Sequence, residues 1–256
     1  MGEARTAIVT GASSGIGRAI ACAFGAESWK VAVGARRKDR LDEVAAEVET
    51  AGGESFAHPL DVTDPRSIGE FFTAVEDGLG PVDTLVNNAG TSTPGRFHTI
   101  DDEALRREVD TNLLGPMLTS RRAITSLLAR GNGGDLVFIS SDATHHARPR
   151  MAAYSATKAG VELLARSLAM ELEGSGIRST IVRVGPTVTE FGSSWPVDEI
   201  QELMEYWPRY GLQRHGGVLA AEDVARAVVT AVTAPAGVHV DTIEVQPEAP
   251  GPGRPA

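Results

Sequence analysis

The sequence predicts an α/β protein with a doubly wound parallel sheet of about seven strands and helices on both of its faces. Short apolar runs alternate with longer segments rich in Ala and Glu, from residue 6 to residue 245. These runs are apolar throughout, which indicates strands that are buried on both faces. The first run leads directly into a glycine-rich turn and a helix-like segment, so the alternation begins with a β–α unit.

The apolar runs are the expected strands, and the segments between them are expected to be helical. The strands are Thr6–Thr10, Lys30–Gly34, Glu54–Pro59, Thr84–Asn87, Leu136–Ser140, Ile177–Val184 and His239–Val245. The clearest helical segments are Arg40–Ala51, Ser67–Gly78 and Val161–Glu173. Because no linker interrupts the alternation, we expect residues 1–246 to form a single domain.

Two segments depart from this alternation. Residues 190–217, here called the lid segment, contain two of the three tryptophans and two of the three tyrosines of the chain. An insertion of this length is more often functional than only structural, so we expect it to cover a substrate. Residues 247–256, the proline-rich tail, contain four prolines and are expected to be disordered.

Composition and charge are those of an ordinary soluble globular protein. The 256 residues are 42% hydrophobic and 23% charged, which allows a sizeable core. A formal net charge of −10 argues against a nucleic acid or an anionic membrane surface as the partner, because both would repel the protein. A single cysteine, no signal-peptide pattern and no apolar stretch of membrane-spanning length together indicate a cytoplasmic protein.

The glycine-rich turn after the first strand predicts a dinucleotide site. Gly11, Gly15 and Gly17 follow the strand and open a helix. Glycines allow a tight turn and the close approach of backbone to a pyrophosphate, whose charge the helix N-terminus stabilises. The alternative is a tight turn without a ligand. The spacing is GxxxGxG, which differs from the GxGxxG of the standard fingerprint.

With this spacing the chain resembles the short-chain dehydrogenase/reductase family, whose first turn reads TGxxxGxG. Further motifs of the family follow in order along the chain. They are Asp61–Val62 after the third strand, NNAG at residues 87–90, Asn112, Ser141, Tyr154 and Lys158. The resemblance implies a Rossmann-like oxidoreductase that interconverts a carbonyl compound and an alcohol with a nicotinamide cofactor.

The resemblance also implies which residues contact the cofactor. They are Gly11, Ser13, Ser14, Gly15, Ile16 and Gly17 in the first turn, Asp61 and Val62 near the adenine, Asn88, Ala89 and Gly90 after the fourth strand, Tyr154 and Lys158 at the nicotinamide ribose, and Thr187 and Thr189 at the nicotinamide. One position departs from the family pattern PGxxxT, because Val184 replaces the proline before Gly185.

The end of the second strand favours NADP over NAD. An NAD-specific protein carries an acidic residue there, which binds the ribose 2′-hydroxyl. This chain has Ala35, followed by Arg36, Arg37 and Lys38, and a cluster of cations accommodates a 2′-phosphate. Two observations leave NAD as the alternative: the arginines could be a solvated helix start, and Ser14 replaces the basic residue of some NADP-using relatives.

Tyr154 and Lys158 lie one helical turn apart, which suits acid–base catalysis. A tyrosine with a pKa of about 10 is a poor catalyst near neutrality, and a nearby ammonium favours the phenolate. The resemblance implies that Tyr154 is the general acid and base, and that Lys158 also binds the nicotinamide ribose. It further implies that Ser141 binds the substrate oxygen, with Ser140 as the alternative, and that Asn112 anchors a water that relays protons.

Other interpretations are less compatible with the sequence. Asp142, His145 and His146 follow Ser141, but a hydrolase would need a GxSxG elbow, so they are expected to line the rim. No residue cluster has the spacing of metal ligands, so no metal is expected. A non-catalytic dinucleotide-binding sensor would lack part of the Ser–Tyr–Lys set, and a sugar-nucleotide epimerase would have a larger C-terminal domain.

The substrate and the oligomeric state are less well determined. The aromatic lid segment predicts a mostly apolar substrate. A 3-oxoacyl thioester or a 3-hydroxy acid would need a cation near the site, for which the candidates are Arg148, Arg150 and Arg209. Apolar residues of the helix after Tyr154 are either core or a dimer face, and we expect a homodimer or homotetramer. These residues are Leu163, Leu164, Leu168 and Met170.

Overall fold

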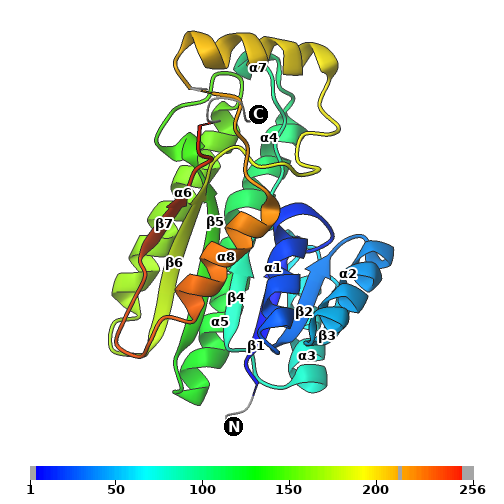
Figure 1. The fold of residues 1–256 in the computed structure, drawn as a ribbon, viewed down its shortest axis with the longest axis vertical. Coiled ribbons are helices and arrows are strands. Elements are labelled where there is room, and N and C mark those ends of the chain that lie inside the picture. Colours follow the sequence, from blue (N-terminus) through cyan, green and yellow to red (C-terminus); the bar gives the residue numbers. More distant parts are fainter. Residues whose placement is uncertain (1–3, 213–214, 250–256) are drawn as a thin grey trace.

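The apolar runs pair into one all-parallel sheet, as the sequence predicts. The structure is a computed structural model, which describes residues 4–212 and 215–249. Its seven strands have the order β3-β2-β1-β4-β5-β6-β7 (Figure 1). The strands are β1 Thr6–Thr10, β2 Lys30–Ala35, β3 Glu54–Pro59, β4 Thr84–Asn87, β5 Gly134–Ser141, β6 Ile177–Val184 and β7 Thr242–Val245.

The predicted start of the last strand is wrong. Residues 239–241 precede β7 and contact β6 mainly through side chains instead of a regular backbone ladder. The His239 ring lies 2.9 Å from the Ser179 carbonyl, and the Thr180 hydroxyl donates to the Val240 carbonyl at 2.7 Å. Regular pairing therefore begins only at Thr242, opposite Ile181.

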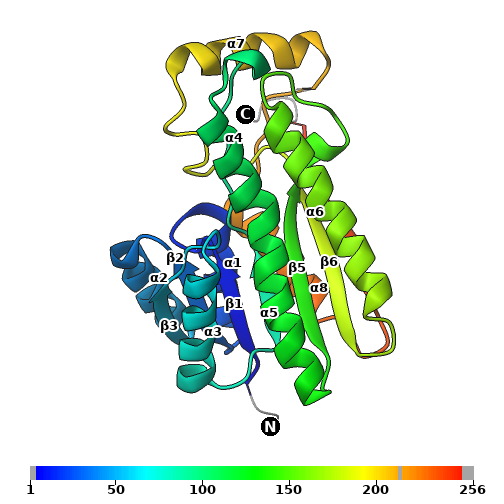
Figure 2. The same ribbon diagram turned by 180° about the vertical axis from the view of Figure 1, so that it is seen from behind.

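Helices cover both faces of the sheet. They are α1 Gly15–Ala26, α2 Lys38–Ala51, α3 Pro65–Leu79, α4 Asp102–Val109, α5 Gly115–Arg130, α6 Ala152–Glu171, α7 Val197–Arg209 and α8 Ala221–Val232. One face carries α1, α2 and α8 (Figure 1), and the other carries α3, α5 and α6 (Figure 2). A separate apolar cluster fills the space on each face. Helix α6 carries both Tyr154 and Lys158, as expected, and its first turns are made of the small residues from Ala152 onward.

The topology places an opening at the carboxyl ends of the central strands. The strand order reverses between β1 and β4, and ligands of open parallel sheets bind at such a reversal. Helix α7 of the lid segment lies beyond this edge of the sheet (Figure 1). Residues 213–214 of that segment lie outside the described residues, and so does the proline-rich tail from residue 250 onward. Among the described helices, none has the length and apolar character that crossing a membrane requires.

A buried ion pair fixes α6 against β5 and β6, directly behind this edge. Arg183 on β6 and Glu162 on α6 lie 2.8 Å apart, and their side chains are 5% and 6% exposed. Glu162 also accepts hydrogen bonds from Ser140 and Thr144. Burial alone would raise the pKa of Glu162, but hydrogen bonds from Arg183 and the two hydroxyls outweigh it and hold the pKa below its usual range.

Replacing Glu162 by alanine should lower the free energy of unfolding by about 3 kcal/mol, because it leaves the buried Arg183 without its main partner. Urea unfolding at neutral pH measures this loss, and the double variant Glu162→Ala/Arg183→Met should recover part of it. Since the folded pKa of Glu162 is lowered, its contribution is complete at neutral pH and disappears as the pH falls through that pKa. A single variant as stable as wild type would contradict this account.

Candidate active site

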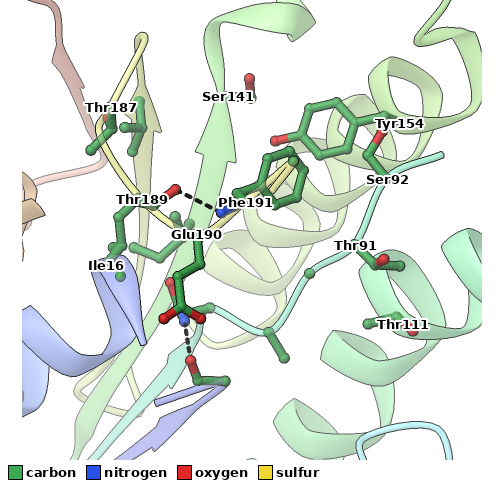
Figure 3. A pocket seen from close by; sticks show the side chains of 18 of the residues that line it. Ile16, Thr91, Ser92, Thr111, Ser141, Tyr154, Thr187, Thr189, Glu190 and Phe191 are labelled. Atoms are coloured by element: carbon green, nitrogen blue, oxygen red, sulfur yellow. Dashed lines mark hydrogen bonds between the residues drawn. The ribbon is translucent and has the colours of Figure 1, made fainter. Parts of the chain in front are cut away.

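A cavity of about 700 Å³ opens at the carboxyl ends of β1, β4, β5 and β6. Its walls come from the turns that follow these strands, from the start of α6 and from the lid segment. Figure 3 shows that Ile16 and Glu190 lie toward one end of it and Ser141 and Tyr154 toward the other. The cavity therefore joins the glycine-rich turn to the predicted catalytic residues.

The glycine-rich turn depends on glycine at specific positions. Gly11 and Gly15 have φ angles of +65° and +54°, a region that residues with a side chain rarely adopt. A Cβ at Gly17 would lie 2.5 Å from the Asn88 amide nitrogen, so a larger residue would push this turn away from β4. Asn88 in turn donates to the Thr10 carbonyl at 2.9 Å. The ends of β1 and β4 are thus held together at the floor of the cavity.

Two arginines and an aspartate lie at the end of the cavity near β2. Arg36, Arg37 and Asp61 all line it. The Arg37 guanidinium donates to the hydroxyls of Ser13 and Ser14 at 3.0 and 3.2 Å. The sequence did not predict a further neighbour of Arg37, the lid residue Glu190, whose carboxylate lies 3.4 Å from the guanidinium.

Asp61 is held in place by its own turn. It accepts hydrogen bonds from the backbone and the hydroxyl of Thr63 at 2.9 and 2.7 Å. Burial alone would raise the pKa of Asp61, but these bonds outweigh it and lower the pKa. The aspartate is therefore charged at neutral pH, beside Val62 in the cavity wall.

Tyr154 and Lys158 face the cavity from the first turns of α6. The Lys158 ammonium donates to the Ile139 carbonyl of β5 at 2.8 Å, and it lies 5.8 Å from the centre of the Tyr154 ring. Only 6% of Lys158 is exposed. The Tyr154 hydroxyl points toward the side of the cavity that holds Ser141 and Thr187 (Figure 3).

The pKa values of this pair differ from the simple expectation. Burial raises the pKa of Tyr154 to about 12, and the neighbouring Ser141 hydroxyl only partly opposes this effect. Burial also lowers the pKa of Lys158 to about 8. In the protein without ligands, burial thus dominates over the attraction between ammonium and phenolate, and the tyrosine holds its proton firmly at neutral pH.

The structure distinguishes the two serines at the end of β5. The Ser140 hydroxyl donates to the buried Glu162 carboxylate at 2.8 Å, so its proton already has an acceptor within the protein. The Ser141 hydroxyl accepts from the Ala143 backbone at 3.2 Å and lines the cavity near Tyr154 (Figure 3). This geometry favours Ser141 over Ser140 as the residue that contacts a substrate.

Asn112 supports the cavity from behind. It belongs to a π-helical turn, Asp110–Leu114, which joins α4 to α5, and such turns often occur at functional sites. Its amide group bonds to the Thr91 backbone nitrogen and oxygen, both at 2.8 Å, and to the Thr157 hydroxyl at 3.2 Å. Only 1% of Asn112 is exposed. It fixes the strand-end turn near Gly90 and the helix that carries Lys158.

Thr187 and Thr189 line the cavity after β6. The Thr187 hydroxyl donates to the Gly185 carbonyl at 2.9 Å, and the Thr189 hydroxyl accepts from the Phe191 backbone at 3.1 Å. The turn that contains both threonines is therefore ordered by its own hydrogen bonds, although Val184 stands where the family has a proline.

The lid segment places aromatic rings over Tyr154. The Phe191 ring lies 5.5 Å from the Tyr154 ring, and the Trp195 ring lies 5.6 Å from that of Phe191. The Trp195 indole donates to the Ser92 carbonyl at 3.0 Å, which ties the lid segment to the turn after β4. Trp207 lines the same cavity. The lid segment therefore packs beside Tyr154, and its role as a cover over a substrate stays a prediction.

The three candidate cations have different surroundings. Arg148 lines the cavity and is only 6% exposed. Arg150 forms ion pairs with Glu199 and Glu202 and does not line it. Arg209 lies over the ring of Tyr210, likewise away from the cavity. The two histidines expected at the rim, His145 and His146, do not line the cavity either.

Most residues that the sequence singled out are brought together. The cavity is lined by Gly11, Ser13, Ser14, Gly15, Ile16, Arg36, Arg37, Asp61, Val62, Asn88, Ala89, Gly90, Ser141, Tyr154, Lys158, Thr187 and Thr189, whereas Gly17 and Asn112 lie behind its wall. The sequence did not single out Ser92, Arg107, Met151, Glu190 or Val218, which also line it. No local motif marks these five, because they come from separate segments that meet only in the folded chain. In the described parts of the chain no group of His, Cys, Asp and Glu is placed to bind a metal.

Comparisons with known proteins agree with this geometry. Residues 5–199 match the model of the short chain dehydrogenase family. A sulfoacetaldehyde reductase from Chromohalobacter salexigens is 32% identical over 94% of this chain and 93% of its own. A glycine betaine reductase from Emericella nidulans is 35% identical over 95% of this chain, which spans only 19% of that protein. An alcohol dehydrogenase from Thermococcus sibiricus, solved with 5-hydroxy-NADP, has a TM-score of 0.83 at 31% identity and covers 98% of this chain and 99% of its own.

Proposed function

Since the chain belongs to the short-chain dehydrogenase family, we propose that it is an NADP(H)-dependent oxidoreductase that interconverts a ketone or aldehyde and an alcohol. The observation that carries this proposal is the shared cavity. Ser141, Tyr154 and Lys158 line the same space as the glycine-rich turn and the two arginines after β2. A dinucleotide bound along this space would bring its nicotinamide to the tyrosine and its adenosine phosphates to the cations.

The residues present fit such a cofactor. Gly11 and Gly15 provide backbone without side chains at the start of α1, where a pyrophosphate would lie at the helix N-terminus. Arg36 and Arg37 would bind a 2′-phosphate, and no acidic residue occupies position 35. When bound, the reduced cofactor supplies the hydride.

In this mechanism Tyr154 moves the proton. During reduction its hydroxyl donates a proton to the carbonyl oxygen of the substrate, and during oxidation the phenolate accepts one. The Ser141 hydroxyl donates a hydrogen bond to the same substrate oxygen, where negative charge develops. The charged Lys158 stabilises the phenolate left behind and would bind the nicotinamide ribose hydroxyls. Asn112, beside Gly90, would anchor the water that returns a proton to this group.

The walls of the cavity favour a substrate with a mostly apolar body. Its lining includes apolar and aromatic side chains, namely Phe191, Trp195, Trp207, Met151 and Val218. A panel of ketones, aldehydes, a 3-oxoacyl thioester and a 3-hydroxy acid, followed by NADPH oxidation or NADP⁺ reduction, tests the reaction class. Turnover of at least one carbonyl compound or alcohol supports the proposal. Dinucleotide binding without turnover of any would indicate a non-catalytic sensor instead.

The charge of the two arginines should set the choice of cofactor. Replacing both Arg36 and Arg37 by alanine should raise the KM for NADPH at least about tenfold, because charged hydrogen bonds to the 2′-phosphate are lost, and should change the KM for NADH far less. Steady-state kinetics with each cofactor measure this. Lys38→Ala is the matched control, since Lys38 pairs with Asp42 and does not line the cavity. Equal use of NADH and NADPH by the wild type would contradict the assignment of NADP.

The proposal includes a homodimer or homotetramer in the cytoplasm. Leu163 and Met170 on α6 are 66% and 73% exposed, and Leu128 on α5 is 51% exposed. Both helices lie on the same face of the sheet (Figure 2), and exposed apolar faces often mark interfaces. Leu164 and Leu168 pack inward instead, so only part of the helix supports the expected dimer face.

A further inference from the structure

An ion pair forms the wall of the cavity next to the catalytic serine. The Asp142 carboxylate and the Arg148 guanidinium lie 2.6 Å apart, and their side chains are 13% and 5% exposed. Both residues line the cavity. An ion pair costs more free energy to bury than a hydrophobic pair of similar size. A buried ion pair that faces a ligand cavity is therefore a candidate for a function there.

The lid segment shields this pair from water. The Trp207 ring lies 4.8 Å from the guanidinium carbon of Arg148, and Arg148 also donates to the Leu212 carbonyl at 3.2 Å. Arg148 has five N–H groups. Within residues 4–212 and 215–249, Arg148 donates hydrogen bonds to Asp142 and Leu212, so part of its donor capacity there is left for a ligand in the cavity.

The pair lies within reach of the reacting atoms. The second carboxylate oxygen of Asp142 is 3.5 Å from the Ser141 hydroxyl oxygen, which is the group that would hold the substrate carbonyl. Besides burial, which is the largest cause, the charge of Asp142 raises the pKa of Tyr154 and that of Arg148 lowers it. A substituent on the neighbouring carbon that extends past Ser141 would therefore reach Asp142 and Arg148.

A further polar atom beside Arg148 lacks a partner. The Trp207 indole nitrogen is buried without a hydrogen bond among the described residues. Such an orphaned group costs free energy unless a ligand or water satisfies it. A purely hydrocarbon substrate would leave this nitrogen, and the spare donors of Arg148, unsatisfied.

We propose that Asp142 and Arg148 select substrates that carry a hydroxyl group on the carbon next to the reacting carbonyl. This inference rests on the proposed function and narrows its substrate class to hydroxyketones, hydroxyaldehydes and the corresponding vicinal diols. A hydroxyl can donate to the carboxylate and accept from the guanidinium at the same time. A carboxylate in that position would instead face the negative charge of Asp142, since the charge of Arg148 is already compensated.

The reaction balances without any further reagent. The carbonyl carbon receives the hydride, with its two electrons, from the reduced cofactor. The carbonyl oxygen receives the proton of Tyr154, which is restored from solvent. The neighbouring hydroxyl keeps its proton and its oxidation state, and the product is a diol.

Three ketones that differ at a single carbon test this selection: acetophenone, α-hydroxyacetophenone and phenylglyoxylate. Wild type should show a kcat/KM at least about tenfold higher for α-hydroxyacetophenone than for acetophenone, because one charge-assisted hydrogen bond is worth that factor. In Asp142→Asn and in Arg148→Met this ratio should fall below about threefold. A merely structural ion pair would lower both kcat/KM values together and leave the ratio unchanged.

Arg150→Met provides the matched control, since Arg150 pairs with the lid residues Glu199 and Glu202 but does not line the cavity. In this variant the ratio of kcat/KM for α-hydroxyacetophenone to that for acetophenone should equal the wild-type ratio. Thermal unfolding establishes that each variant is folded. Equal kcat/KM for acetophenone and α-hydroxyacetophenone in wild type would overturn the inference, and so would a preference for phenylglyoxylate. If acetophenone alone were reduced by NADPH, the proposed function would stand and this inference would fail. If no carbonyl compound were reduced, both the proposed function and this inference would be wrong.

Discussion

Replacing Tyr154 by phenylalanine should lower kcat for carbonyl reduction about a thousandfold, because the variant lacks the proton that the carbonyl oxygen must receive. The change removes one oxygen atom and leaves the ring that packs against Phe191. Burial raises the pKa of Tyr154 to about 12, so the wild-type hydroxyl is protonated at neutral pH and ready to act as the acid. The decrease in NADPH absorbance under saturating substrate measures kcat directly.

The binding of cofactor should be nearly unaffected in this variant, which separates catalysis from binding. NADPH fluorescence titration should give a Kd within about threefold of wild type, since the phenol oxygen provides at most one neutral hydrogen bond. Tyr206→Phe is the matched control, because Tyr206 belongs to α7 of the lid segment and does not line the cavity. A Tyr154→Phe protein with wild-type kcat would remove Tyr154 from the mechanism.

Replacing Lys158 by methionine should lower kcat/KM at least about a hundredfold, through the loss of a buried positive charge beside the developing phenolate. Methionine fills a similar volume, so the change mainly removes the charge from a position that is 6% exposed. The variant should also bind NADPH more weakly, since the ammonium would hold the ribose hydroxyls. Kinetics and fluorescence titration together separate these two effects.

The pH profile gives this second prediction a distinct signature. Burial lowers the pKa of Lys158 to about 8, so the ammonium loses its proton as the pH rises through this value. Reduction needs the charged form, and kcat/KM of wild type should therefore decrease above pH 8. The Lys158→Met variant should lack this decrease, whereas the surface variant Lys38→Met should retain it. A profile of the same shape in wild type and Lys158→Met would contradict the role given to the ammonium.

The sequence predicted those parts of the fold that depend on local chemistry. Central strands such as β1 and β4 have consecutive apolar residues at their centres, and only a sheet covered on both faces buries such runs. The turn at Gly11–Gly17 could also be predicted from the sequence, because glycine is required where φ is positive or where Asn88 approaches the backbone. The start of β7 could not be predicted, because the His239 ring contacts the Ser179 carbonyl and the Thr180 hydroxyl contacts the Val240 carbonyl where a regular strand would pair through its backbone.

The residues proposed for catalysis could be picked out of the sequence, whereas the residues proposed to contact the substrate could not. Ser141, Tyr154 and Lys158 belong to two elements whose spacing the family preserves, and a motif can express that spacing. The pairing of Asp142 with Arg148 depends on where the lid segment places Trp207 and Leu212. Such contacts between distant segments leave no periodic signal in the sequence. The sequence also suggested that Lys158 would lower the pKa of Tyr154. The burial of Tyr154 follows only from the folded structure, and it raises this pKa instead.

The central claim is that NADPH bound in this cavity gives its hydride to a carbonyl carbon of the substrate, while Tyr154 supplies the proton. Its most direct test is mass spectrometry of the alcohol formed from α-hydroxyacetophenone with NADPH that carries deuterium at both C4 positions. The account predicts one deuterium on the carbinol carbon with wild type, and almost no product with Tyr154→Phe in the same time. Consumption of the labelled cofactor without deuterium in the alcohol, or equal labelled product from both proteins, would contradict it.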